Sequence, residues 1–135
     1  SMENKPEYIL DAKLKGYDVE INVWWKEDGF YLGHDEPQYK VSRDFLREPK
    51  FWCHAKNVDA LSSMISLGAH CFWHEEDGHT ITSKGYIWTH PKEFPCKNGI
   101  YVSNSFNKSL IGMCHGLCSD YVSKYKAELI SGKTK

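Results

Sequence analysis

Apolar and polar residues alternate through YDVEINVWW, the stretch from residue 17 to residue 25. Side chains along a strand point alternately to its two faces, so the apolar set takes one face while Glu20 and Asn22 share the other. The Asp-Gly pair at 28–29 is typical of a tight hairpin turn, after which residues 30–32 pair back as a second strand. The pattern predicts a hairpin whose first strand carries two oxygen-bearing side chains on one face.

The rest of the chain alternates helix signals with short apolar runs. Helices are expected where a capping residue precedes a helical apolar pattern, at 4–16, 42–46 and 57–68 with Asn4, Ser42 and Asn57 as caps, and again at 120–130. Strands are expected over 51–55, 70–73, 80–82, 86–89, 99–102 and 117–119. Strands separated by helices favour a mostly parallel sheet with the helices outside it.

Several of these strands end in a polar residue: His34, His54, His74, His90 and Asp120. In a (β/α) barrel the chemistry is carried at the carboxyl ends of the strands. The helices are too few for eight complete βα units, so the expected α/β fold is a reduced TIM-type barrel with few helices. The length of the chain suits one compact domain, which we place at residues 3–132, with residues 1–2 as a tag scar or a start.

Composition narrows the classes of function. The formal net charge is −1, which argues against a general nucleic-acid binder. The five cysteines are odd in number and form no CxxC pair, so we expect reduced thiols in a cytoplasmic protein rather than a disulfide framework. Neither a signal peptide nor a long apolar run is visible, so no membrane span is expected.

The polar face of the first strand is a candidate metal site. Two oxygen ligands two residues apart, as Glu20 and Asn22 are, can hold a hard cation such as Mg²⁺ or Ca²⁺. An edge strand with a solvated polar face is the alternative. His34 follows soon after and can protonate a leaving alkoxide in phosphodiester cleavage, or it is an ordinary surface histidine.

The strand at 51–55 adds two further candidates. His54 and Lys56 share a face, so His54 can join a metal shell while Lys56 neutralises a phosphate oxygen or simply reaches solvent. Trp73 and Trp88 lie at the ends of later strands. Each is either an aromatic residue of the core or rim or a residue that contacts substrate. The histidines between 70 and 90 fit no standard zinc spacing.

The stretch GYDVEINVWWKEDGFYLGHDEP resembles a motif of the glycerophosphodiester phosphodiesterases, in which a Glu-x-Asp strand and an Asp-Gly turn precede a His-Asp pair. The likeness is greater to a compact bacterial and viral branch of that PLC-like phosphodiesterase family. It extends, in order, over about residues 3 to 125, through ENKPEYI, GYDVEINVW, LGHDEPQYKV, FWCHAKN, FWHEEDGHTITSKGYIWTHP and GLCSDYVSKY.

The resemblance implies a PLC-like barrel, a divalent metal and hydrolysis of a small phosphodiester. By position, Glu20 would be a metal ligand, His34 the general acid and Lys56 the residue facing the phosphate. His54 falls where larger members of the family place a carboxylate ligand. We expect Mg²⁺ or Ca²⁺ to be bound weakly by Glu20, Asn22 and His54, with Trp73 and Trp88 near the substrate.

Two departures from the family pattern point to impaired catalysis. Glu-x-Asp is here Glu20-x-Asn22, and the strand ending in His-Arg-Gly, which would precede residue 3, is lacking. The edge left by that strand favours a homodimer or a local closure of the sheet. The sequence therefore predicts a metal-dependent phosphodiesterase of reduced activity, or alternatively an inactive module that binds a phosphate-bearing ligand or a protein partner.

Overall fold

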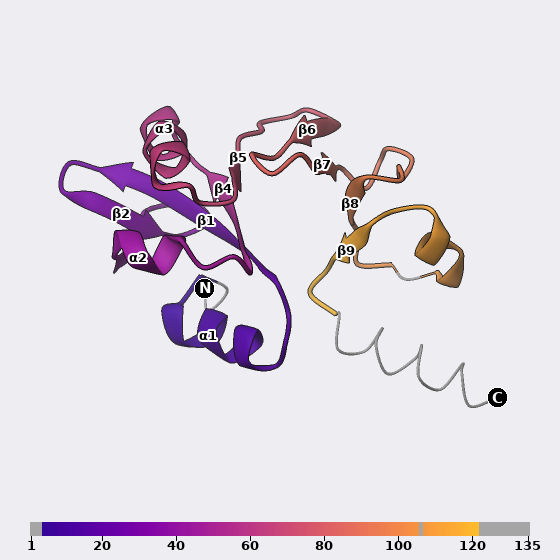
Figure 1. The fold of residues 1–135 in the computed structure, drawn as a ribbon, viewed down its shortest axis with the longest axis horizontal. Helices are drawn as coiled ribbons and strands as arrows, with labels where there is room; N and C mark the ends of the chain where they lie inside the picture. The colour runs from indigo at the N-terminus through magenta and orange to yellow at the C-terminus, as the bar shows by residue number, and fades with distance from the viewer. Residues whose placement is uncertain (1–3, 106, 122–135) are drawn as a thin grey trace. The chain divides into compact units, whose positions relative to one another are not determined.

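The computed structural model describes residues 4–105 and 107–121, which Figure 1 shows in colour. The chain divides into two compact units. The first unit comprises residues 1–75 with 82–84, and the second comprises 76–81 with 85–135. Within the described residues, no helix combines the length and the apolar character needed to cross a membrane.

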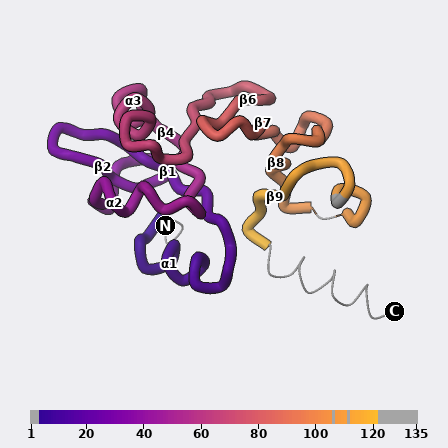
Figure 2. Tube along the Cα trace, in the orientation of Figure 1, coloured from indigo at the N-terminus to yellow at the C-terminus, as the bar shows by residue number. Residues whose placement is uncertain are grey.

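A five-stranded sheet in the order β3-β2-β1-β4-β5 forms the centre of the first unit. Its strands are β1 (Val19–Lys26), β2 (Gly29–Leu32), β3 (Tyr39–Val41), β4 (Phe51–Ala55) and β5 (Cys71–Phe72). The predicted hairpin is confirmed, because β1 and β2 pair antiparallel with Lys26 opposite Gly29, and the tube in Figure 2 follows this turn. On its other side β1 pairs in parallel with β4, which in turn pairs in parallel with β5.

Three α-helices accompany this sheet: α1 (Pro6–Leu14), α2 (Arg43–Leu46) and α3 (Val58–Leu67). Two predicted caps are confirmed, since Ser42 accepts a hydrogen bond from the N–H of Phe45 and Asn57 accepts one from the N–H of Ala60. Gly68 ends α3 in a left-handed conformation at φ 77°, which glycine adopts without the steric cost of a side chain. The prediction that Asn4 caps this helix is wrong, because Lys5 is the N-cap residue of α1.

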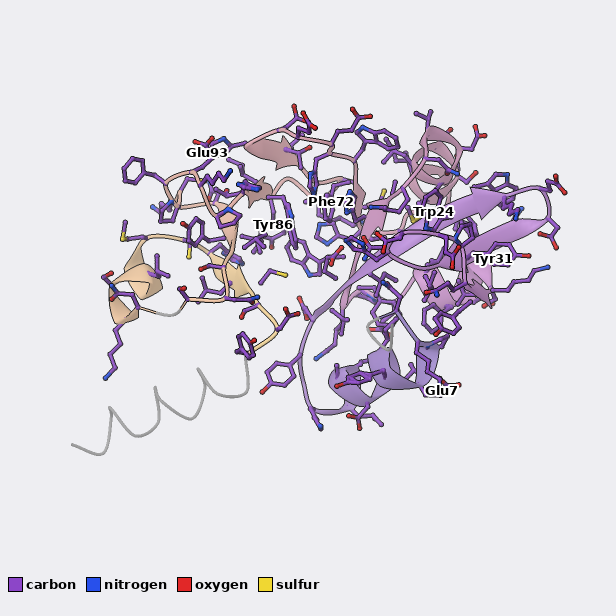
Figure 3. The ribbon with its side chains drawn as sticks, turned by 180° about the vertical axis from the view of Figure 1, so that it is seen from behind. Glu7, Trp24, Tyr31, Phe72, Tyr86 and Glu93 are labelled. Carbon is purple, nitrogen blue, oxygen red and sulfur yellow. The ribbon has the colours of Figure 1, made fainter. Side chains whose placement is uncertain are left out.

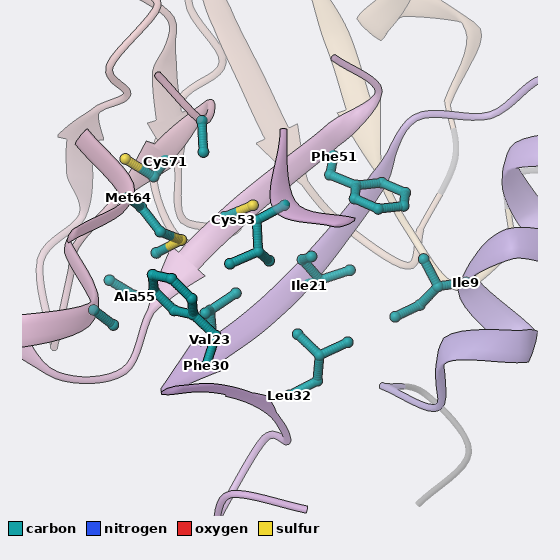
Figure 4. Close-up of a cluster of buried hydrophobic side chains, with 13 residues drawn as sticks. Ile9, Ile21, Val23, Phe30, Leu32, Phe51, Cys53, Ala55, Met64 and Cys71 are labelled. Atoms are coloured by element: carbon teal, nitrogen blue, oxygen red, sulfur yellow. The ribbon is translucent and has the colours of Figure 1, made fainter. Parts of the chain in front are cut away.

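The apolar face of the sheet forms the core of the first unit. The alternate residues Ile21 and Val23 of β1 are fully buried, as are Cys53 of β4 and Met64 of α3, and Figure 4 shows their side chains together. Each such apolar side chain stabilises the fold by about 1.5–3 kcal/mol on burial. This burial assigns one face of β1 and β4 to packing and leaves the other for the polar side chains.

A four-stranded sheet in the order β6-β7-β8-β9 belongs to the second unit. Its elements are β6 (His79–Ile81), β7 (Ile87–Thr89), β8 (Gly99–Val102), a 3₁₀ helix η1 (Lys108–Gly112) and β9 (Gly116–Cys118). Strands β7, β8 and β9 run parallel, and β6 pairs antiparallel with β7. The helix predicted over 120–130 falls almost wholly outside the described residues.

The predicted reduced PLC-like (β/α) TIM-type barrel is wrong. The described chain forms two small mixed sheets of five and four strands, neither of them closed, with only three α-helices. The antiparallel strands β2 and β3 extend one edge of the first sheet, where a barrel would need further parallel strands joined by helices. Polar strand ends misled the prediction because they occur in open parallel sheets as well as in barrels.

Candidate functional site

The polar face of the first sheet gathers side chains from β1 and β4. Because Ile21 and Cys53 point into the core, the side chains of Glu20, Asn22 and His54 take the opposite face. In the parallel register Asn22 lies directly opposite His54. Lys56 continues the alternation just beyond β4, where its N–H donates to the carbonyl oxygen of Val23 at 2.8 Å.

Glu20 and His54 are ionisable groups that lie close together on this face. The Oε2 atom of Glu20 lies 3.8 Å from Nδ1 of His54, and their side chains are 22% and 12% exposed. The other ring nitrogen, Nε2, lies 3.3 Å from the carbonyl oxygen of His74. A carbonyl oxygen can only accept, so the hydrogen-bond pattern assigns the proton of a neutral ring to Nε2 and a lone pair to Nδ1.

The pKa of His54 is lowered to about 4, mainly by burial of the ring and to a smaller extent by the charges of His74, Lys56 and His34. The hydrogen bond to the His74 carbonyl acts in the opposite direction and is outweighed. His54 is therefore neutral at pH 7.

Aromatic neighbours fix the plane of the His54 ring. It stacks on the ring of His74, with centroids 4.3 Å apart and planes 10° from parallel. Phe72, labelled in Figure 3, stacks on it from β5 at 5.1 Å and 9°. Sequence reasoning noted His74 only as a polar strand end and missed its support of His54, although both residues follow the same alternation in neighbouring parallel strands.

His34 follows a tightly constrained glycine at the end of β2. The N–H of Gly33 donates to the carbonyl oxygen of Asn22 at 3.1 Å, and the indole N–H of Trp24 donates to the carbonyl oxygen of Gly33 at 2.7 Å. A side chain at Gly33 would collide with the carbonyl oxygen of Glu36. Glycine therefore lets the chain turn close beside the polar face of β1, on which Trp24 lies.

The carboxylate of Asp35 orients the His34 ring. Its Oδ1 atom lies 2.8 Å from Nδ1 of His34, whose side chain is 58% exposed. When Nδ1–H donates to the carboxylate, Nε2 is the nitrogen that can exchange a proton with a ligand. The pairing is thus suited to general acid–base chemistry at an accessible position.

Asn22 is nearly inaccessible to solvent, at 2% exposed, although the sequence placed it in a ligand shell. Its backbone N–H donates to Oδ1 of Asn4 at 2.9 Å, and Asn4 is itself 2% exposed. Among the described residues, Nδ2 of Asn4 is buried without a hydrogen-bond partner. The side chain that the sequence assigned to a helix cap instead completes the hydrogen bonding of β1.

The two tryptophans predicted to contact substrate lie in different units of the chain. Trp73 packs against the hydrophobic core on the other side of the first sheet. Trp88 belongs to β7 in the second unit, where it is only 7% exposed. Both positions match the core role that was the alternative for these aromatics.

Few side chains that could bind an ion lie together at the predicted metal site. Among the residues that the structure describes, no three histidine, cysteine or carboxylate side chains gather where they could hold one ion. Oε2 of Glu20 and Nδ1 of His54, two atoms that can bind a metal ion, nevertheless lie 3.8 Å apart, and Asn22 lies opposite His54 in the register. The residues fit a site with two or three protein donors, whose remaining positions water and substrate would complete.

Comparison with known proteins gives no match, whether to a family model, a curated protein or a solved structure. The resemblance to the glycerophosphodiester phosphodiesterases stays a prediction. The functional argument therefore rests on the geometry of the polar face.

Proposed function

We propose that the chain binds a small phosphodiester on the polar face of its five-stranded sheet and hydrolyses it slowly with the help of a divalent metal. The observation that carries the proposal is that Glu20, His54 and Lys56 follow one face of β1 and β4, with Glu20 and His54 3.8 Å apart, beside the turn at Gly33 that precedes His34. In the hydrolysis, water attacks phosphorus, the bond to the leaving alkoxide breaks, and the proton of the water passes to solvent. A cationic side chain that binds the phosphate, a divalent ion and a proton donor for the alkoxide assist this reaction.

Lys56 and His34 act on the substrate in this proposal. The ammonium group of Lys56 neutralises a non-bridging phosphoryl oxygen, which favours binding and stabilises the charge that develops during attack. Nε2 of His34 gives its proton to the leaving alkoxide. Asp35 holds the ring in the required orientation, because its carboxylate pairs with Nδ1 at 2.8 Å.

Glu20 and His54, with the amide oxygen of Asn22, would hold the metal. A bound divalent ion supplies positive charge to the phosphoryl oxygens. The proposal assigns a general acid but no general base to activate the attacking water. Because each partner in acid–base catalysis typically contributes about 10²–10⁴-fold, slow turnover is expected.

The second candidate is a binding module that holds a phosphate-bearing ligand without cleaving it. It is favoured by Asn22, a neutral and almost fully buried amide where a second carboxylate would strengthen a metal site. In this function Lys56 and His34 supply the charge that recognises the anion. The two functions predict the same binding residues and differ in turnover.

Hydrolysis of an aryl phosphodiester in the presence of Mg²⁺, Ca²⁺ or Mn²⁺ tests the proposal. Slow release of the phenol is expected, with His34→Ala and Glu20→Ala each lowering it by about 10²–10⁴-fold. His79→Ala, at an exposed position of β6 in the second unit, serves as the matched control and should leave the rate unchanged.

Robust turnover that survives both substitutions would show that the site is wrongly chosen. If no turnover occurs, calorimetry with a phosphorothioate diester separates the two candidates. Binding that is lost in Lys56→Ala would favour the binding module. Absence of both turnover and binding would exclude each function.

A further inference from the structure

Two aromatic side chains lie beside the proposed phosphate-binding lysine on the polar face of the first sheet. Tyr31 of β2 lies opposite Trp24 of β1 in the antiparallel register, and Figure 3 labels both on this hairpin. Lys56 follows Ala55, the partner of Val23 in β4, and its N–H donates to the Val23 carbonyl oxygen at 2.8 Å. Because that pair points into the core, Trp24 and Lys56 occupy neighbouring positions on the opposite face.

The two rings are accessible from the side of the sheet that faces away from the three α-helices of the first unit. These helices contribute Ile9, Leu46 and Met64, one residue each, to the hydrophobic core on the apolar side. Trp24 and Tyr31 lie on the other side and are each partly exposed. A flat ligand can therefore contact these rings without displacing any of the three helices.

Hydrogen bonds hold both rings in place before a ligand binds. The indole N–H of Trp24 donates to the carbonyl oxygen of Gly33 at 2.7 Å, and the hydroxyl of Tyr31 donates to Oδ1 of Asp28 at 2.9 Å. Side chains that are already ordered lose less conformational entropy on binding. Gly33 directly precedes His34, so Trp24 is tied to the turn that carries the proposed proton donor.

Positive charge accompanies the rings on this face. Lys26 of β1 and Lys40 of β3 alternate onto the same side of the sheet. The turn carboxylates Glu27 and Asp28 offset this charge in part, and Oδ2 of Asp28 lies 2.8 Å from Nζ of Lys40. Lys56 follows β4, on the side of β1 away from β2, so we assign the phosphate of a ligand to Lys56.

A flat aromatic surface next to a cation favours one class of phosphodiester. An aliphatic diester offers its phosphate to the lysine but has no ring to stack on the aromatic side chains. A nucleoside diester carries a negative phosphate and flat bases in one molecule, and bases of any sequence stack on aromatic rings. Neighbouring strands lie about 4.8 Å apart, so Trp24 and Lys56 can contact the base and the phosphate of one nucleotide.

We propose that the ligand of the polar face is a nucleoside phosphodiester, whose base stacks on Trp24 and Tyr31 while its phosphate binds Lys56. The inference rests on the proposed function, since it names the substrate class of the same site. It concerns a short nucleotide ligand, because the net charge of −1 disfavours general binding of long nucleic acids.

Calorimetry with the full chain in chelator compares two diesters that carry the same single negative charge. Adenylyl-adenosine offers two bases, whereas glycerophosphoglycerol offers none. We expect the dinucleotide to bind about 5- to 150-fold more tightly, the factor that stacking of one base on an aromatic ring contributes. Lys56→Ala should weaken the binding of both diesters, because both present the same phosphate.

Substitutions of the rings test the stacking itself. Trp24→Leu removes the flat ring but keeps apolar bulk, so the preference for the dinucleotide should fall at least fivefold while the affinity for glycerophosphoglycerol is unchanged. Trp24→Phe should restore most of the preference. Tyr31→Leu repeats the test at the neighbouring ring if Trp24→Leu fails to fold, which circular dichroism checks. Tyr8→Leu, at an aromatic residue of α1 that is 50% exposed, is the matched control and should leave both affinities unchanged.

The outcomes separate this inference from the proposed function. Equal affinities for the two diesters, or a preference that survives both Trp24→Leu and Tyr31→Leu, would overturn the inference and retain the proposed phosphodiester site. Dinucleotide binding that depends on Trp24, without release of adenosine when a divalent ion is added, would retain the inference and reject hydrolysis. Absence of binding by either diester would overturn the inference as well.

The deoxyribose form of the dinucleotide distinguishes the two sources of such a ligand, RNA and DNA. Dependence on Trp24 with either sugar supports the inference, and the tighter of the two complexes identifies the sugar.

Discussion

At the scale of single residues, the buried amide of Asn22 controls how well the site can hold an ion. Replacing it by aspartate in Asn22→Asp adds a carboxylate opposite His54, so ion affinity should rise. The same change places a charge at a position that is 2% exposed, which costs about 3–5 kcal/mol when no ion neutralises it. Affinity and ion-free stability should therefore change in opposite directions.

Calorimetry and denaturant unfolding, each with and without the ion, measure the two effects. We expect Asn22→Asp to unfold more easily than the native protein in chelator and to recover when the ion is added. Equal ion binding by the two proteins would remove Asn22 from the site.

Only part of the site can be read from the residues in sequence. Strict alternation predicts that Glu20 and Asn22 share one face, as His54 and Lys56 do, because the period of a strand is two. The contacts that orient these groups follow no period. The His74 carbonyl lies 20 residues beyond His54, and Asn4 lies 18 residues before Asn22, so tertiary folding alone brings them together.

At the scale of elements, Asn57 links α3 to the C-terminal end of β1. Its Oδ1 accepts from the N–H groups of Ala60 and Trp25 at 3.0 and 3.2 Å, and its Nδ2 donates to the Trp25 carbonyl at 2.8 Å. Asn57→Ala should therefore lower the free energy of unfolding by roughly 2–3 kcal/mol, since a cap and two further hydrogen bonds are lost.

Ser42→Ala is the matched control, because Ser42 caps α2 through one hydrogen bond to Phe45. Its expected cost is about 0.5–2 kcal/mol. Urea unfolding of both variants measures the comparison. If Asn57→Ala lowers the free energy of unfolding no more than Ser42→Ala does, the contacts to Trp25 contribute nothing measurable to stability.

Local signals located most elements but not their arrangement. The caps Ser42 and Asn57, the Asp-Gly turn and the strand at Phe51–Ala55 were all predicted where the structure has them. The short strand β3 and the 3₁₀ helix η1 were missed, because three to five residues carry too little periodicity. The barrel prediction failed because strand order is set by long-range pairing, which no local pattern encodes.

At the scale of the whole molecule, the two compact units carry unequal shares of the predicted site. The residues predicted to bind metal or substrate or to act in catalysis fall in the first unit, with the exception of Trp88. The predicted homodimer stays a prediction, and light scattering of the full chain tests it. A mass corresponding to one chain would favour local closure of the sheet instead.

Stability should also depend on pH through the buried histidines of the first unit. The pKa of His54 is about 4 in the folded chain against 6.5 for an unperturbed histidine, with burial as the main cause. Burial likewise lowers the pKa of His70. Between pH 6.5 and 4 the unfolded chain thus binds more protons than the folded one, so stability is fully present above pH 6.5 and falls as the pH is lowered.

The size of the His54 contribution follows from the shift. The difference between the folded and unfolded pKa values of His54 corresponds to a free energy of unfolding of about 3 kcal/mol at most. We expect about 2 kcal/mol, because the ring is not completely shielded from water. Carboxylates that are paired in the folded state, such as Asp28 and Glu48, have pKa values below the ordinary ones of 3.8 and 4.5. Their contribution to the stability of the protein is therefore lost only at lower pH. The range above about pH 4.5 therefore isolates the histidines.

Urea unfolding followed by tryptophan fluorescence in chelator suits this measurement, because four of the five tryptophans lie in the first unit. The free energy of unfolding should fall from pH 7 to pH 4.5 in the native protein. In His54→Gln, which cannot take up a proton, most of that decrease should disappear, while the exposed-site control His79→Ala should retain it. If His54→Gln loses as much stability over this range as the native protein, His54 is not held neutral by the fold, and the lone pair directed at Glu20 loses its physical basis.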